Sequence, residues 1–89
     1  MKLINLINTD VDLDSLARYC QAEDAILLRQ DAVYLCLRPE LCWPVEQVFA
    51  LQTDLAVRQL TASSGVQTVS AQQWVELSAK ATQNILWQK

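Results

Sequence analysis

Short apolar runs alternate with amphipathic segments along this chain. Five of these runs have the length and composition of buried strands: residues 2–7, 24–30, 47–52, 66–70 and 84–88. The intervening segments carry apolar stripes at helical spacing, first Leu13, Leu16, Ala17 and Cys20, and later Trp74, Leu77, Ser78 and Ala81. This alternation predicts an α/β fold: a single small domain over residues 1–89, with a mostly parallel sheet of four to five strands covered by helices on both faces.

Polar residues mark the expected helix boundaries. The first helix has four candidate caps, Thr9, Asp10, Asp12 and Asp14. A second helix is predicted to begin at Thr53 or Asp54 and to run to the only glycine, Gly65, and a third begins at Ser70. Residues 31–46 are mixed: the first part favours a turn of helix, and two prolines then prevent regular structure, Pro39 and Pro44.

Polar residues also follow the predicted strands, where the carboxyl ends of a parallel sheet offer a site. They are Gln30 and Asp31 after one strand, and Asp54, with Arg58 four residues later, after the next. These four residues are strand-end candidates for a site or for a subunit contact. The structural alternatives are a helical i,i+4 pair between Asp54 and Arg58, or a helix cap at Asp54. One glycine cannot make a phosphate-binding loop or a dinucleotide fingerprint.

Composition and charge reduce the number of functions that this chain could have. A chain of 89 residues buries only about 60 to 65% of its unfolded surface, yet 52% of its residues are hydrophobic, so we expect a subunit interface. The net charge is −3 and the basic residues are scattered, which argues against direct contact with nucleic acid. Without histidine, a histidine base is excluded, and no metal-ligand spacing or cofactor motif is present.

The location is predicted to be cytoplasmic. No run approaches the roughly 18 apolar residues of a membrane span, and the first residues lack the pattern of a secretory signal. Three cysteines, an odd number, fit a reducing compartment: Cys20, Cys36 and Cys42. Cys20 lies on the inward stripe of the first helix and is expected to be a buried, inert thiol. Cys36 has a packing context, and no nearby group would lower the pKa of Cys42.

Three blocks, in this order, resemble the TusB (DsrH-like) family of sulfur-relay proteins, within the DsrE/DsrF/DsrH-like superfamily. The block "AILLRQDAVY" is similar to the family's strand followed by Gln/Glu-Asp-Gly-Val/Ile-Tyr. The block "VFALQTDLAVRQL" is similar to its apolar strand, Ala-Leu and Asp-Leu-x-Ala-Arg-Gly-Leu. The tail "AQQWVELSAKATQNILW" is similar to its terminal helix, with a tryptophan near the C-terminus, here Trp87.

The resemblance implies a small DsrE/DsrF/DsrH-like α/β subunit that joins TusC-like and TusD-like subunits in a heterohexamer. Such a complex accepts persulfide sulfur from a TusA-like donor and passes it to a TusE-like acceptor, toward 2-thiolation of the tRNA wobble uridine. The persulfide cysteine belongs to the TusD-like subunit, and the TusB-like subunit is structural. Trp74 is expected in the core, whereas Trp43 and Trp87 are expected at contacts with sister subunits, because tryptophan is enriched where interface energy concentrates.

The sequence departs from the family pattern at three positions. Ala32 replaces the usual glycine after Asp31, and Val57 and Gln59 replace the Ala and Gly around Arg58. If those glycines serve backbone freedom, the turns in this chain must use ordinary dihedrals.

These observations predict an accessory subunit that is not an enzyme by itself and holds no cofactor. Two other interpretations stay open. The chain is a DsrH-like subunit of a sulfur-oxidation relay in which Cys20 carries persulfide, or it is a stand-alone homo-oligomer with an unrelated partner.

Overall fold

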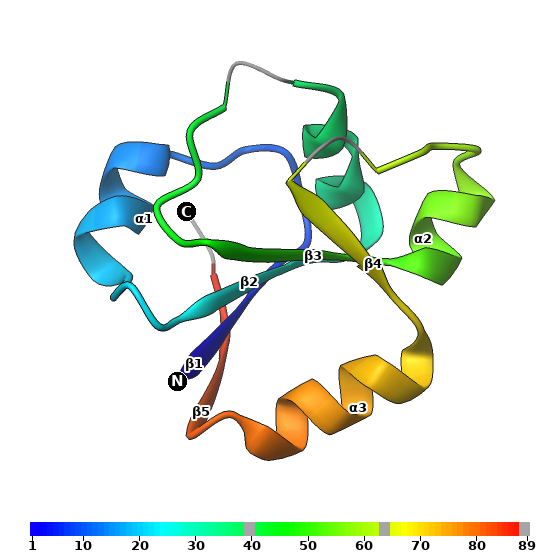
Figure 1. Ribbon diagram of the computed structural model, residues 1–89. Coiled ribbons are helices and arrows are strands. Elements are labelled where there is room, and N and C mark those ends of the chain that lie inside the picture. The colour runs from blue at the N-terminus through cyan, green and yellow to red at the C-terminus, as the bar shows by residue number, and fades with distance from the viewer. Residues whose placement is uncertain (39–40, 63–64, 88–89) are drawn as a thin grey trace.

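The computed structural model describes residues 1–38, 41–62 and 65–87 and contains one five-stranded parallel sheet, in the order β4-β3-β2-β1-β5 (Figure 1). The strands are β1 Lys2–Leu6, β2 Ala25–Leu28, β3 Gln47–Leu51, β4 Val66–Val69 and β5 Gln83–Leu86. The helices are α1 Leu13–Tyr19, the 3₁₀ helix η1 Gln30–Leu37, α2 Gln52–Val57 and α3 Ala71–Lys80. The predicted α/β architecture is confirmed.

The strand order explains which helix covers which face. From β1 to β4 the chain moves steadily across the sheet, so right-handed crossovers place α1, η1 and α2 on one side, the three-helix face. The return from β4 to β5 runs in the opposite direction and places α3 on the other side, the α3 face. Figure 1 shows α3 alone below the sheet, with α1 above it.

Side-chain alternation along the strands builds a core on each face. Neighbouring positions such as Leu3 and Ile4 of β1 are both fully buried, but they point to opposite faces. The core of the three-helix face is the larger one and includes Leu16 and Leu55, contributed by α1 and α2. The two-sided burial accounts for the nearly continuous apolar runs in the sequence.

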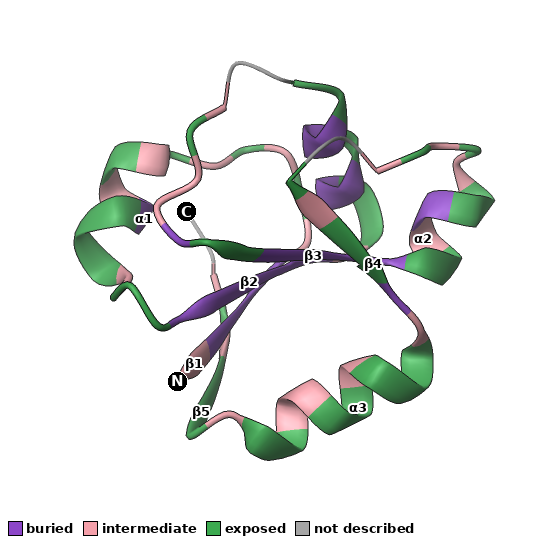
Figure 2. Cartoon of the chain, in the orientation of Figure 1, coloured by how far each residue is buried: buried purple, intermediate pink, exposed green. Residues whose placement is uncertain are grey.

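The α3 face has the thinner cover. No residue of α3 is fully buried (Figure 2). Trp74 and Leu77 lie half-buried against the sheet. The helix begins as predicted at Ser70, whose hydroxyl accepts from the Gln73 N–H at 3.1 Å while the Gln73 side chain accepts from the Ser70 N–H at 2.8 Å. This capping box fixes the start of the helix.

The first helix follows the prediction only in part. Its cap is Asp12, one of the four candidates, whose carboxylate accepts from the Asp14 N–H and the Ser15 hydroxyl. Ala17, expected on the inward stripe, is exposed instead. The helix is only two turns long, so it buries a single side chain fully, that of Leu16.

The second helix corrects two predictions. It ends at Val57 and not at Gly65, because Gln59 adopts a left-handed conformation (φ +54°). The Leu60 N–H donates to the Leu55 carbonyl at 2.9 Å and the Gln59 N–H to the Ala56 carbonyl at 3.1 Å, the two bonds of a Schellman motif. The expectation of ordinary dihedrals is therefore wrong at Gln59, where the family glycine would fit best, whereas Ala32 has no positive φ.

The start of α2 also differs from the prediction. Neither Thr53 nor Asp54 caps α2. The N-cap position, directly before the helix, is occupied by Leu51, and no side chain accepts a hydrogen bond from the first backbone N–H groups of the helix. Residues 31–37 lie in η1, in line with the turn of helix predicted there. Pro39, and the Gln88 that was assigned to the last strand, lie outside the described residues.

Candidate functional site

The carboxyl ends of β2 and β3 are joined by Asp54. One oxygen of its carboxylate accepts a hydrogen bond of 2.8 Å from the backbone N–H of Gln30, the residue that begins η1. Gln30 lies in the left-handed region (φ +51°), which is costly for a residue with a side chain. Asp54 therefore holds a strained corner in place, and it does so instead of capping its own helix.

Arg58 completes the contact from the end of α2. Its Nε and Nη2 donate to one carboxylate oxygen of Asp31 at 3.2 and 2.9 Å, and its Nη1 donates to the Asp54 carbonyl at 3.2 Å. The predicted i,i+4 pair is present as well, with 3.7 Å between Nη1 and the Asp54 carboxylate. The hydrogen bond from Arg58 to Asp31 raises the pKa of the guanidinium above its ordinary value. We call Gln30, Asp31, Asp54 and Arg58 the strand-end clamp.

An exposed stripe runs from the strand-end clamp along η1. A 3₁₀ helix has three residues per turn, so Asp31, Tyr34 and Leu37 share one face while the residues between them are buried. The Tyr34 side chain is 40% exposed and that of Leu37 is 56% exposed. The Arg58 guanidinium lies 5.8 Å from the centre of the Tyr34 ring, so the stripe and the clamp form one surface. We call Asp31, Tyr34 and Leu37 the η1 stripe.

The strand-end clamp connects the turn after β2 to the helix after β3. The carboxylates of Asp31 and Asp54 both contact the Arg58 guanidinium. The Asp54 carboxylate also accepts a hydrogen bond from the Gln30 backbone N–H. These contacts fix the two turns and orient η1. What the surface offers outward is an aromatic ring and a leucine beside a charged pair, a mixture that suits contact with another protein.

The cysteines lie elsewhere. Cys20 follows α1 on the connection to the amino end of β2, and Cys42 precedes the amino end of β3, so both belong to the end of the sheet opposite the strand-end clamp. Cys20 is half-buried, and burial, followed by the nearby Asp24 carboxylate, raises the pKa of its thiol despite the opposing effect of Lys2. Cys36 is buried in the core of the three-helix face, and Cys42 is exposed.

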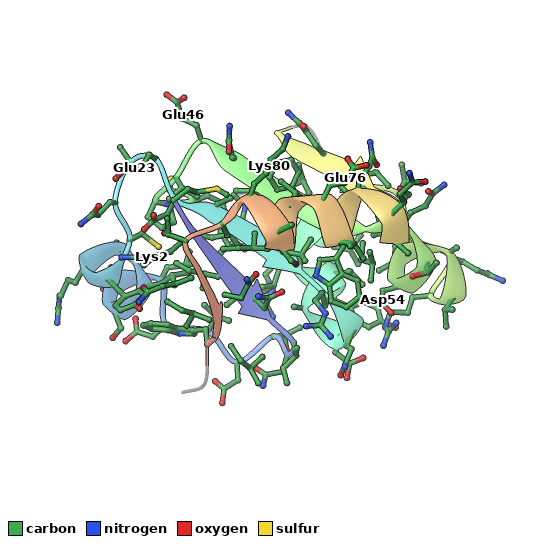
Figure 3. All side chains as sticks on the ribbon, turned by 90° about the horizontal axis from the view of Figure 1, so that it is seen from below. Lys2, Glu23, Glu46, Asp54, Glu76 and Lys80 are labelled. Atoms are coloured by element: carbon green, nitrogen blue, oxygen red, sulfur yellow. The ribbon has the colours of Figure 1, made fainter. Side chains whose placement is uncertain are left out.

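That opposite end carries a buried carboxylate that sequence reasoning missed. Asp24 is 2% exposed, and its two oxygens accept from the backbone N–H groups of Lys2 and Gln21, both at 2.9 Å. The Lys2 ammonium lies 3.3 Å from the same carboxylate. Burial acts to raise the pKa of Asp24, but these bonds and the ammonium outweigh it and hold the pKa below its usual value. Figure 3 shows Lys2 far from Asp54.

The two loop tryptophans do not join the strand-end clamp. Trp43 and Trp87 are half-buried and pack against the core of the three-helix face. The Trp87 ring also lies 5.2 Å from that of Tyr19, centre to centre. Trp74 packs on the α3 face as expected, and the Arg29 guanidinium stacks over its ring at 4.3 Å. The role of Trp43 and Trp87 at contacts with sister subunits stays a prediction.

Within residues 1–38, 41–62 and 65–87, no three Cys, Asp or Glu side chains gather closely enough to hold a metal ion. None of the helices in these same segments has the length and apolar character needed to cross a bilayer.

Comparison with known proteins decides the family. The sequence model described as "DsrH like protein" matches residues 8–84. The chain belongs to the DsrH-like family. Among solved structures, this DsrH-like chain is similar to the solution NMR structure of protein Tm0979 from Thermotoga maritima, with a TM-score of 0.67 and 29% sequence identity. The match covers 89% of this chain and 92% of Tm0979. No curated protein matches the sequence significantly.

Gln30, Asp31, Asp54 and Arg58, which the sequence predicts at strand ends, meet at the carboxyl ends of β2 and β3. Their role in a site or a subunit contact stays a prediction. Tyr34 and Leu37 were missed, although the sequence carries their signal. From residue 31 to residue 37, the three-residue spacing of Asp, Tyr and Leu matches a 3₁₀ period better than an α-helical one.

Proposed function

We propose that this DsrH-like chain is a non-catalytic structural subunit of a TusBCD-like sulfur-relay complex. In that role it joins TusC-like and TusD-like subunits in a cytoplasmic heterohexamer. The complex takes persulfide sulfur from a TusA-like donor and delivers it to a TusE-like acceptor, toward 2-thiolation of the tRNA wobble uridine. The chain itself contacts neither tRNA nor membrane.

The main support is the state of the strand-end residues. In a parallel sheet, this edge is where chemistry is usually found, yet here the charged side chains are bonded to one another and to backbone. The exposed Tyr34 and Leu37 lie directly beside them. A preorganised surface with exposed aromatic and aliphatic side chains favours docking, and the DsrH-like family membership supplies the sulfur-relay context.

The thiols give secondary support. A persulfide carrier needs an accessible thiol with thiolate character. The pKa of Cys20 is raised, chiefly by burial, so its thiolate fraction at neutral pH is lower than that of an ordinary cysteine. Direct persulfide transfer by Cys20, as in a sulfur-oxidation relay, is therefore the less favoured function.

Co-expression with TusC-like and TusD-like proteins tests the assembly. We expect the three chains to co-purify, and we expect Leu37→Asp to abolish or strongly weaken this association, because it places a charge on the η1 stripe. Val75→Asp is the matched control. It introduces the same charge at an aliphatic residue that is 66% exposed on α3, and it should leave the complex intact.

Three outcomes would contradict the proposal. The first is that the wild-type chain does not co-purify with the TusC-like and TusD-like proteins. The second is that Val75→Asp weakens the complex as much as Leu37→Asp does. The third is that mass spectrometry of the working complex finds persulfide on Cys20, and Cys20→Ser stops sulfur transfer while the complex stays assembled.

A further inference from the structure

The segment that contains α3 and β5 is poorly buried. No residue of α3 or of β5 is fully buried, whereas all four residues of β2 are. The other helices, α1, η1 and α2, each bury at least one apolar side chain on the three-helix face. Apolar burial is the main stabilising contribution to a folded element, so α3 and β5 are held less firmly than the elements around them.

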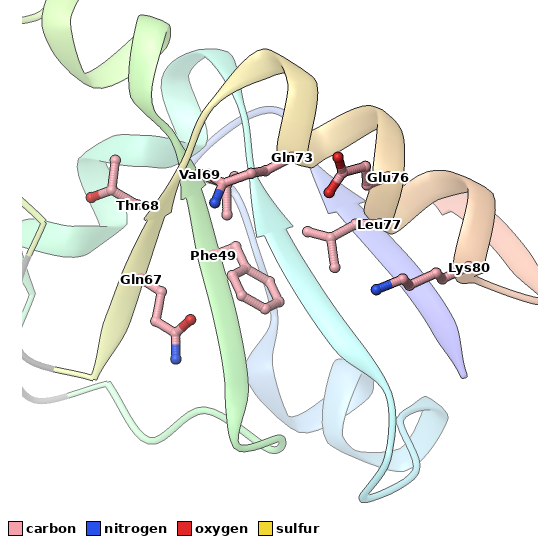
Figure 4. A pocket seen from close by; sticks show the side chains of 8 residues that line it. All are labelled: Phe49, Gln67, Thr68, Val69, Gln73, Glu76, Leu77 and Lys80. Carbon is pink, nitrogen blue, oxygen red and sulfur yellow. The ribbon is translucent and has the colours of Figure 1, made fainter.

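An open cavity of about 210 Å³ lies between α3 and the sheet. Phe49 and Val69 line it from β3 and β4, and Leu77 lines it from α3 (Figure 4). Protein interiors are normally packed without voids of this size. The contact between α3 and these two strands is therefore incomplete.

The sheet topology allows this segment to leave without disturbing the other strands. β5 is an edge strand that pairs only with β1 among the described residues. Its departure breaks that one ladder, and the pairs β1–β2, β2–β3 and β3–β4 stay complete. The Asn84 side chain of β5 donates to the Ser78 carbonyl of α3 at 3.0 Å, which couples the two elements to each other.

Two aromatic contacts hold the segment against the rest of the molecule. The Trp74 ring of α3 lies under the Arg29 guanidinium at 4.3 Å, and the Trp87 ring after β5 lies 5.2 Å from that of Tyr19. Both tryptophans are only half-buried, so solvent competes with each contact.

A buried amide beneath the segment favours its release. Asn5 points to the α3 face, as Leu3 does, and is 7% exposed. Its Nδ2 donates to the carbonyls of Leu3 and Ile85 at 3.4 and 3.2 Å, but no group of the described residues donates to its Oδ1. A buried acceptor without a donor costs free energy. This cost is removed once α3 and β5 move away and water reaches the amide.

We propose that α3 and β5 form a strap, residues 71–87, that opens as one unit while the sheet from β1 to β4 stays folded. An isolated helix of ten residues is marginal in water, so α3 loses its hydrogen bonds when it detaches. In the open state β1 becomes an edge of the sheet and the core of the α3 face meets solvent (Figure 1). That exposure keeps the open state a minor population. The proposal does not depend on the proposed function, because it concerns the isolated chain.

Native-state hydrogen exchange of the purified chain measures this opening. We expect the hydrogen-bonded amides of α3 and β5 to share one opening free energy and to be protected at least about tenfold less than those of β2 and β3. Opening exposes less surface than global unfolding does, so exchange in the strap should also depend less steeply on urea.

A matched pair of tryptophan variants separates strap opening from global unfolding. Trp74 lies in the strap, whereas Trp43, also half-buried, packs against the core of the three-helix face. Trp74→Ala removes contacts that only the closed state makes, so exchange should quicken by the same factor in the strap and in β2 and β3. Trp43→Ala removes contacts that the open state keeps. Exchange should then quicken in β2 and β3 and stay within about twofold of the wild type in the strap.

If an alanine variant does not fold, Trp74→Phe and Trp43→Phe give the same comparison with smaller changes. The proposal is overturned if the amides of α3 and β5 exchange only together with those of β2 and β3, with the same urea dependence. It is also overturned if they exchange at unrelated free energies without urea dependence, as single residues that fray do. A Trp43 variant that quickens exchange in the strap as much as in β2 and β3 would have the same consequence.

Discussion

Replacing Asp54 by alanine tests whether this side chain holds the corner after β2. The substitution removes the 2.8 Å bond to the Gln30 N–H, and Gln30 is then left in a left-handed conformation without its tether. A hydrogen bond to a charged group contributes about 1.5–3 kcal/mol to stability. The Asp54 side chain is 22% exposed, so solvent competes for it, and we expect a loss of about 1–2 kcal/mol.

This loss is measurable in a chain of this size. For domains of 60–100 residues, 1 kcal/mol corresponds to a shift in Tm of roughly 4–8 °C, so Asp54→Ala should lower Tm by roughly 4–16 °C. Urea unfolding followed by tryptophan fluorescence gives the free energy directly, with the slope of the transition as a check that the unfolded state is unchanged. Asp54→Asn keeps a hydrogen-bond acceptor without the charge, so its Tm should lie between those of the wild type and Asp54→Ala.

Asp31→Ala is the matched control within the strand-end clamp. Asp31 receives two hydrogen bonds from Arg58, but its side chain is 66% exposed, and exposed ion pairs contribute little. Its loss should therefore change Tm much less than the loss of Asp54. The reasoning is refuted if Asp31→Ala destabilises the chain as much as Asp54→Ala. A further check is the Gln30→Gly background, where the left-handed conformation costs little and Asp54→Ala should cost less.

Three further predictions concern other parts of the chain. Gln59→Gly should raise stability by about 0.5–1 kcal/mol in urea unfolding, because glycine adopts the left-handed turn after α2 without a side-chain clash, whereas Gln59→Ala should not. The carboxyl pKa of Asp24 is depressed in the folded state, so its contribution to stability is present above the unfolded pKa of about 3.9 and is lost as the pH falls through the folded pKa. Acid unfolding curves of wild type and Asp24→Asn should therefore converge below about pH 4; parallel curves would contradict the assignment. Under native conditions, a thiol reagent should modify Cys42, which is exposed, well before Cys20, whose thiol pKa is raised; mass spectrometry of timed samples distinguishes the order.

The sequence was most informative where burial alone decides the structure. The strands β1, β2 and β3 were found from their apolar runs, because a strand covered on both faces needs apolar residues at nearly every position. The start of α3 was found from Ser70 because capping is a local effect.

Other features depend on tertiary contacts, and sequence patterns could not reveal them. Asp54 looked like a helix cap, yet its carboxylate bonds to Gln30, which is 24 residues away in sequence. The end of α2 was misplaced because Gln59 occupies a conformation that sequence statistics assign to glycine. The contacts between Asp24 and Lys2 form because β1 pairs with β2, and they join residues that lie 22 apart in sequence.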